Sequence, residues 1–293
     1  MTLKDDLLRA AGRARTALPH GADRTARFFR HAALATGGFP NRAGQADLYY
    51  TVFGLLGLAA MGEPPPDPTA RYLDTFADGA TLDLVHLCSL ARCWALLEGE
   101  PGAWRQASLT PLSRLAAFRS ADGGFSHVPD AACGTAYGAF LALGAYEDLG
   151  NPLPDADRLA DSLAGLRARD GGYANTPGAE AGGIPATAAA MVTLAAVGRP
   201  PDARAVDWLV AHRLPESGWP AAPGLPVADL LSTATALHAL AATGAHLDTG
   251  REPCRAMVDG LATENGGYRG HSADTVTDCE YSFYGLLALG HLR

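Results

Sequence analysis

The chain has 293 residues, of which 48% are hydrophobic and only 18% are charged. Soluble domains usually carry about 25% charged residues, so this composition excludes intrinsic disorder and allows a large buried core. The formal net charge is −8, and Lys and Arg form no cluster, which argues against a nucleic-acid partner.

The chain begins with a mixed-charge amphipathic segment, residues 1–20, which we predict as an N-terminal helical arm. It lacks the apolar stretch and cleavage site of a secretory signal. The longest apolar stretch, Leu48 to Met61, is shorter than the roughly 20 residues that a membrane span needs. The five cysteines show no paired CxxC spacing, so neither a disulfide framework nor a compact zinc knuckle is expected. We therefore expect a cytoplasmic protein without a membrane span.

From residue 21 onward, a glycine-aromatic signature recurs roughly every 40 to 50 residues. An amphipathic helical pattern precedes each signature, and a segment that is apolar nearly all round follows it. Each repeat therefore predicts one outer helix with a wet face and one inner helix that is buried. The signatures are Gly37-Gly38-Phe39, Gly123-Gly124-Phe125, Gly171-Gly172-Tyr173, Gly218-Trp219 and Gly266-Gly267-Tyr268, with a weaker echo at Asp78-Gly79.

The inner segments can be aligned with one another. Residues 47–58 match residues 278–289 almost position for position, and Thr or Ser recurs at one place in the frame, at Thr51, Thr187, Thr233 and Ser282. We expect these hydroxyls to bond a backbone carbonyl. Six helix pairs account for nearly all of residues 21–293, and no polar capping helix follows Leu289. This favours a closed ring over an open solenoid.

The repeats resemble those of a known superfamily. Segments 114–125, 162–173, 207–219 and 258–268 are similar to the repeat shared by squalene-hopene cyclases, oxidosqualene cyclases and protein prenyltransferase β subunits. The resemblance implies an all-α fold, a single α6/α6 toroid of six repeats over residues 21–293, with a central apolar cavity. It also implies that a helical partner subunit is possible, because the β subunits need one.

The resemblance to zinc prenyltransferases is incomplete at the metal site. Leu231 stands where the family has Cys, and Tyr281 stands where it has His. Cys279 comes one position early, which turns it by about 100° on a helix. We therefore favour no metal and no cofactor. A rearranged zinc site remains the alternative, and its ligands would come from Asp278, Cys279, Glu280, His86 and Asp229.

The resemblance to the cyclases is also partial, because the Asp-x-Asp-Asp run that protonates their substrates is absent. What remains is a set of single carboxylates at the starts of the inner helices. Such an Asp serves first as a helix N-cap. Asp278 and Glu280 are stronger candidates, since two carboxylates near a closed apolar cavity can hold one proton at raised pKa. The candidate catalytic residues are Asp278 and Glu280, with Asp47, Asp83, His86 and Asp229 as alternatives.

Aromatic residues cluster on the first and last inner helices, which become neighbours when the ring closes. Their faces can stabilise a carbocation. We predict substrate-binding roles for Tyr50 and Tyr281 first, and then for Tyr49, Phe53, Tyr137 and Tyr284.

Together these features predict a terpene-cyclase-like enzyme that encloses a hydrophobic, isoprenoid or polyene-like small molecule and cyclises or isomerises it by acid-base chemistry. The Ala-, Arg-, Gly- and Pro-rich composition suggests bacterial specialised metabolism. Two alternatives stay open: a zinc-dependent prenyltransferase with a rearranged site, and a non-catalytic ring that binds a hydrophobic ligand or a partner.

Overall fold

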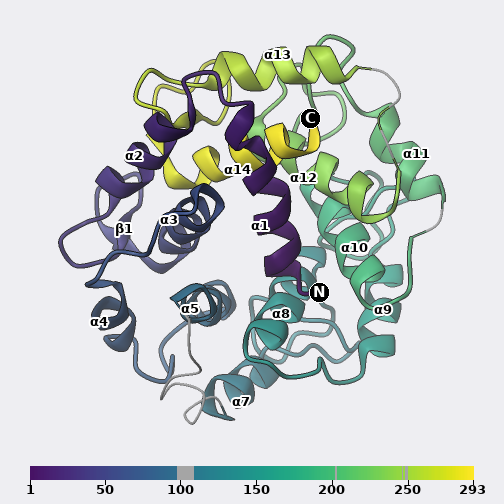
Figure 1. Cartoon of the computed structure of the whole chain (residues 1–293). Coiled ribbons are helices and arrows are strands. Elements are labelled where there is room, and N and C mark those ends of the chain that lie inside the picture. Colours follow the sequence, from purple (N-terminus) through teal and green to yellow (C-terminus); the bar gives the residue numbers. More distant parts are fainter. Residues whose placement is uncertain (98–108, 202, 246, 248–249) are drawn as a thin grey trace.

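The computed structural model describes residues 1–97, 109–201, 203–245, 247 and 250–293, and in these residues the helices form a closed double ring (Figure 1). The predicted α6/α6 toroid is confirmed. The inner ring consists of the apolar helices α3 (Leu48–Met61), α5 (Leu84–Leu97), α8 (Ala136–Asp148), α10 (Ile184–Ala196), α12 (Leu230–Ala242) and α14 (Cys279–His291). The outer ring consists of α2 (Ala22–Ala32), α4 (Thr69–Asp74), α7 (Leu109–Ala117), α9 (Ala156–Gly165), α11 (Ala203–Ala211) and α13 (Arg251–Leu261).

The ring closes between the first and the last repeat. Each inner helix packs against the next in chain order, and α14 packs against α3 (Figure 1). Two antiparallel hairpins precede these two helices: β1 (Phe39–Pro40) pairs with β2 (Ala46–Asp47), and β3 (Tyr268–Arg269) pairs with β4 (Thr277–Asp278). None of the described helices has both the length and the apolarity that a membrane crossing requires.

The glycine-aromatic turns are tied to the inner helices by the recurring hydroxyls. The backbone N–H of Phe39 donates to Thr51 Oγ1 at 3.0 Å, and that hydroxyl donates to the carbonyl of Asp47 at 2.6 Å. Ser282 makes the same two bonds in the last repeat, with Tyr268 and Asp278. The predicted bonds from these hydroxyls to backbone carbonyls are confirmed. They fix each buried aromatic ring against its inner helix, since a buried backbone donor left unpaired is costly.

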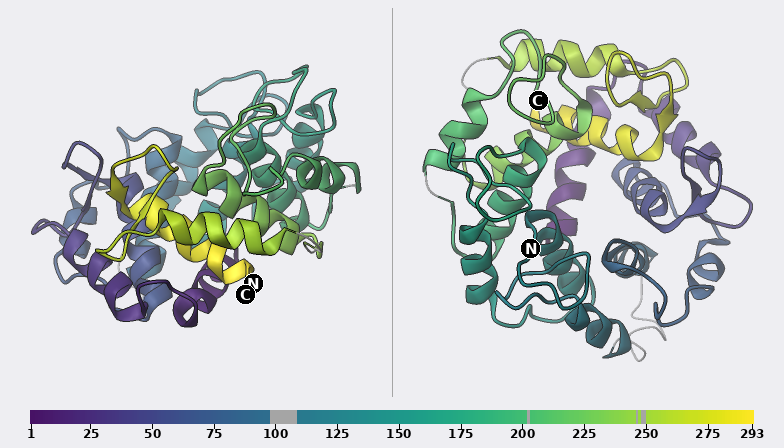
Figure 2. Two further views of the ribbon diagram at one scale, coloured as in Figure 1. Left: turned by 90° about the horizontal axis from the view of Figure 1, so that it is seen from above. Right: turned by 180° about the vertical axis from the view of Figure 1, so that it is seen from behind.

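The N-terminal segment, residues 1–20, contains α1 (Leu3–Arg13) and the 3-10 helix η1 (Ala14–Thr16). Helix α1 crosses the ring at the end where the inner helices terminate (Figures 1 and 2). The Leu3 backbone N–H donates to the Glu147 carboxylate at 2.7 Å, and Arg15 Nε donates to the carbonyl of Ala60 at 2.6 Å. We call this closed end of the ring the floor, and the end where the inner helices begin the mouth.

Candidate active site

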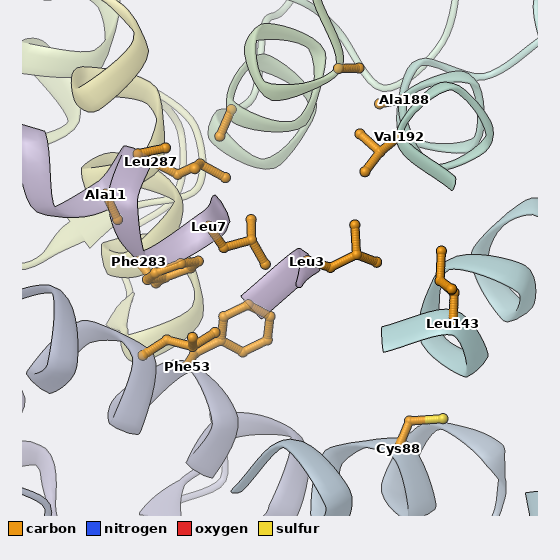
Figure 3. Close-up of a cluster of buried hydrophobic side chains, with 14 of the residues drawn as sticks. Leu3, Leu7, Ala11, Phe53, Cys88, Leu143, Ala188, Val192, Phe283 and Leu287 are labelled. Carbon is orange, nitrogen blue, oxygen red and sulfur yellow. The ribbon is translucent and has the colours of Figure 1, made fainter. Parts of the chain in front are cut away.

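A cavity of about 450 Å³ occupies the centre of the inner ring. Side chains from all six inner helices line it, together with Leu7 of α1 at the floor. Figure 3 shows Phe53, Val192 and Leu287 pointing from three different helices toward this centre. The predicted central apolar cavity is confirmed, and its size lies in the range of small-molecule sites.

The repeat frame places lining residues in layers along the ring axis. The second residue of an inner helix faces the cavity near the mouth, as Tyr49 and Tyr137 do. Glu280 is the second residue of α14 and occupies the same level. The ninth residue faces the cavity near the floor, as Arg92 of α5 and His238 of α12 do. Each layer thus brings together residues that are far apart in the sequence.

Glu280 is the most perturbed carboxylate at the mouth. The residue is only 8% exposed, and among the described residues Tyr49 alone donates a hydrogen bond to its side chain, from Oη to Oε1 at 2.6 Å. Burial raises the pKa of Glu280 from 4.5 to about 7, although the bond from Tyr49 lowers it, and the charge of Asp278 adds to the rise. A carboxyl group with this pKa exchanges its proton at neutral pH.

Asp278 is held by its neighbours in a different way. It caps α14, since Oδ1 accepts the Tyr281 backbone N–H at 2.9 Å. Its other oxygen accepts from Arg42 Nε at 2.9 Å, while Arg42 also binds Asp274. Burial raises the pKa of Asp278, and the cap and the Arg42 guanidinium oppose that rise. Asp278 is therefore fixed in an ion pair, which leaves Glu280 as the better proton donor of the predicted pair.

The remaining predicted acid-base residues lie at helix starts around the mouth. Like Asp278 and Glu280, they are not among the residues that line the cavity. Asp47 caps α3 and Asp229 caps α12 through backbone bonds of 3.1 and 2.7 Å. Asp83 accepts hydrogen bonds from the backbone N–H of His86 and from its ring Nδ1. The other ring nitrogen of His86 lies 3.8 Å from Asp47. The structure gives these four residues mainly capping and pairing contacts.

The predicted substrate-binding aromatics divide into two groups. Tyr49, Phe53, Tyr137 and Tyr284 line the cavity. Tyr50 and Tyr281, which we placed first, lie outside the lining, and the Arg42 guanidinium covers the Tyr281 ring at 5.2 Å. Helix rotation explains the difference, because a step of one residue turns a side chain by about 100°. On α3 the neighbouring residue Tyr49 lines the cavity instead, and on α14 Phe283 and Tyr284 do so.

The residues considered for zinc do not converge. Among the described residues, no three His, Cys, Asp or Glu side chains come together as a metal-binding group. Cys279 is buried, and burial raises the pKa of its thiol. His86 pairs with Asp83 at 2.8 Å and lies 3.8 Å from Asp47.

An ion pair at the floor was missed in the sequence analysis. Arg92 Nε donates to Asp148 Oδ2 within an ion pair that lines the cavity. On α12, His238 Nδ1 lies 3.1 Å from His291 Nε2. The signal was present, since a charged residue inside an otherwise apolar helix needs a partner. The sequence alone did not indicate which helix supplies that partner.

Comparisons with known proteins agree with this architecture. The family model described as the prenyltransferase alpha-alpha toroid domain matches residues 22–91, 112–219 and 187–292. A variant of the type II terpene cyclase MstE from Scytonema, solved with the product merosterolic acid A, has 14% identity and a TM-score of 0.56, and covers 99% of this chain and 98% of its own.

Two further structures of the same cyclase are similar to this chain. A variant in complex with the substrate geranylgeranyl dihydroxybenzoate has 14% identity and a TM-score of 0.55, over 99% of this chain and 98% of that chain. An apo structure has 15% identity and a TM-score of 0.56, over 92% and 96%. At such identities the likeness is one of fold. No curated protein matches the sequence significantly.

Proposed function

The chain belongs to the prenyltransferase alpha-alpha toroid family, and from this premise we propose that it is an enzyme that encloses a polyprenyl chain and cyclises or isomerises it by acid-base chemistry. The setting we propose is bacterial specialised metabolism. The fold is shared with a type II terpene cyclase whose solved complexes contain a prenylated substrate and its product. The cavity of about 450 Å³, with its aromatic and aliphatic lining, suits such a chain.

The observation that carries the proposal is the pair of Glu280 and Tyr49. Glu280 has a pKa of about 7, and the Tyr49 hydroxyl bonded to it lines the cavity. When Glu280 is protonated, the bond to Tyr49 reverses, so that Glu280 donates to Tyr49 Oη and the phenol proton turns into the cavity. In the first step the Tyr49 hydroxyl gives this proton to a carbon of the terminal double bond, while Glu280 gives its own proton to Tyr49. One C–H bond forms, one π bond breaks, a tertiary cation results and Glu280 becomes a carboxylate.

The later steps need no further reactant. The electron pair of a neighbouring double bond attacks the cation, which forms a C–C bond and moves the positive charge along the chain. A proton then leaves the final cation and returns through Tyr49 to Glu280, so the product is an isomer of the substrate. The faces of Phe53 and Tyr284, whose ring centroids are 5.4 Å apart, stabilise the cation.

The test is turnover of polyprenyl alcohols, polyprenyl phenols and polyenes, followed by gas chromatography and mass spectrometry for isomers of unchanged mass. We expect Glu280→Gln and Tyr49→Phe each to lower turnover by about 100-fold or more, the usual contribution of a general acid. Glu147→Gln is the matched control for a half-buried glutamate with a raised pKa. Tyr268→Phe is the control for a buried phenol whose hydroxyl has no described partner.

Two results would contradict the proposal. If Glu280→Gln turns over substrate at the wild-type rate, Glu280 is not the proton source. Tight binding of polyprenyl compounds with no isomer formed by the wild type would instead make the protein a non-catalytic binding ring.

A further inference from the structure

The floor of the cavity carries a buried ion pair. The side chains of Arg92 and Asp148 are 11% and 1% exposed, and both residues line the cavity. Burying two charges costs desolvation free energy, which their mutual attraction often does not offset. An apolar pair of similar volume would therefore stabilise the fold as well. Helix α8 makes room for this arrangement, because a Cβ at Gly144 would lie 2.6 Å from Arg92 Nη2. These costs point to a use for the pair beyond packing.

The pair has hydrogen-bonding capacity to spare. Arg92 uses only Nε toward Asp148, and its two Nη groups donate to no atom of the described residues. Asp148 Oδ1 is buried and accepts no hydrogen bond from any residue that the structure describes. A single oxygen that accepts from Nη and donates toward Oδ1 would satisfy both sides. A hydroxyl group has these two capacities.

The charges that line the cavity select against anions, because Arg92 and Asp148 are the only Lys, Arg, Asp or Glu among its described lining residues. The charges of Arg92 and Asp148 cancel, and burial raises the pKa of Asp148 while Arg92 opposes that rise. On the opposite wall, burial lowers the pKa of His238 to about 4 and that of His291 to about 3, so neither is a cation at pH 7. A carboxylate or diphosphate here would be a buried charge without a counterion.

We propose that Arg92 and Asp148 form a subsite for the neutral hydroxyl group of a polyprenyl alcohol or phenol. The inference rests on the proposed function, whose substrate it narrows and orients. Arg92 is seven residues further along its helix than Glu280, which corresponds to about 10 Å along the ring axis at 1.5 Å per residue. The hydroxyl lies at the floor, the chain runs along the apolar wall, and its terminal double bond lies beside Tyr49 at the mouth.

The test is a binding series on one C15 chain: farnesol, β-farnesene, farnesoic acid and farnesyl diphosphate, titrated at pH 7 by intrinsic fluorescence. Glu280→Gln protein is used, so that turnover during the titration is slow. We expect farnesol to bind at least tenfold more tightly than the other three, since a hydrogen bond to a charged group contributes about that factor. Equal affinity for β-farnesene, or tighter binding of either anion, would overturn the subsite.

Two variants in the same background sharpen the result. Arg92→Met with Asp148→Leu replaces the pair by apolar residues of similar volume, and farnesol should then bind no better than β-farnesene. Asp148→Asn leaves the guanidinium charge uncompensated, so farnesoic acid should overtake farnesol. Unchanged ligand order in both variants contradicts the proposal, and a protein that binds none of the four ligands contradicts the proposed function as well.

The two proposals fail separately. Loss of turnover in Glu280→Gln concerns proton transfer at the mouth, and it leaves the farnesol preference at the floor intact. Conversely, if the Arg92→Met and Asp148→Leu variant turns over substrate at the wild-type rate, Glu280 is supported as the acid and the hydroxyl subsite is contradicted.

Discussion

The mouth and the floor of the cavity use ionisable groups in opposite ways. At the mouth, burial raises the pKa of Glu280 to about 7, within reach of a proton exchange at neutral pH. At the floor, burial lowers the pKa of His238 and His291 well below neutrality, and Arg92 is paired with Asp148. The same helical frame thus places a titrating group at one end and fixed, neutral polarity at the other. Burial alone does not decide function, because its effect depends on the sign of the group that it covers.

The largest expected effect tests the floor. A histidine whose folded pKa lies below the unfolded value of 6.5 binds fewer protons than the unfolded chain, so stability is lost as the pH falls from about 6.5 toward 4. We expect the wild type to lose roughly 3 kcal/mol or more of unfolding free energy between pH 7 and pH 4. The variant with both His238→Leu and His291→Leu should lose much less. Urea denaturation at the two pH values measures the loss of unfolding free energy in each protein. Equal losses in wild type and variant would contradict the conclusion that these two histidines are buried in their neutral form.

The second effect tests the mouth and has the opposite sign. The folded pKa of Glu280 is raised from 4.5 to about 7, so the folded chain binds more protons than the unfolded chain, and stability falls as the pH rises through this window. Glu280→Gln removes this cost. At pH 8 the free energy of unfolding of this variant should exceed that of the wild type by up to about 3 kcal/mol. At pH 4.5 the two values should be similar. A variant that is less stable at pH 8 would show that Glu280 serves the fold.

The third effect tests how the floor is closed. Helix α14 meets α1 at Gly290, where an added Cβ would lie 1.8 Å from the Ala10 carbonyl oxygen. We expect Gly290→Ala to cost about 1 to 3 kcal/mol, because α1 must shift. Gly260→Ala, in a helix where nothing lies within 4 Å of the added Cβ, is the matched control and should be neutral or slightly stabilising. Equal melting temperatures for the two variants would place α1 away from α14.

The smallest effect refines the mouth. The charge of Asp278 raises the pKa of Glu280, whereas Arg42 lowers it. Asp278→Asn should therefore move the pH at which turnover is half-maximal downward, by less than about one unit. The pH dependence of turnover in wild type and variant measures the shift. A shift toward higher pH would mean that another group supplies the proton.

The fold could be predicted because it is a local rule applied repeatedly. Glycine-aromatic turns and two helical hydropathy patterns recur in the sequence, and a helix that is apolar all round must be buried. The recurring hydroxyls, such as Thr51 and Ser282, follow from the same frame.

The site could be predicted only in part. The pair of Asp278 and Glu280 was visible as two carboxylates at the start of α14. The difference between them depends on Arg42, which lies 236 residues away from Asp278 and pairs with it only when the ring closes. Likewise, Tyr50 and Tyr281 were placed ahead of Tyr49 because the rotation of each helix about its axis was unknown. Hydropathy does not define that rotation for a helix that is apolar all round.

Helix α1 also sets an order of events in folding. It packs against α14, and Arg293, which follows α14, donates to the Arg13 carbonyl across 280 residues, so these contacts join the most distant parts of the sequence. Neighbouring repeats can pair as soon as both are synthesised, whereas the floor cannot close until α14 is complete. Contacts of such sequence separation form slowly. Until then the nascent chain exposes the apolar residues that later line the cavity. The docking of α1 is therefore the step at which an open arc of helices becomes an enclosed cavity.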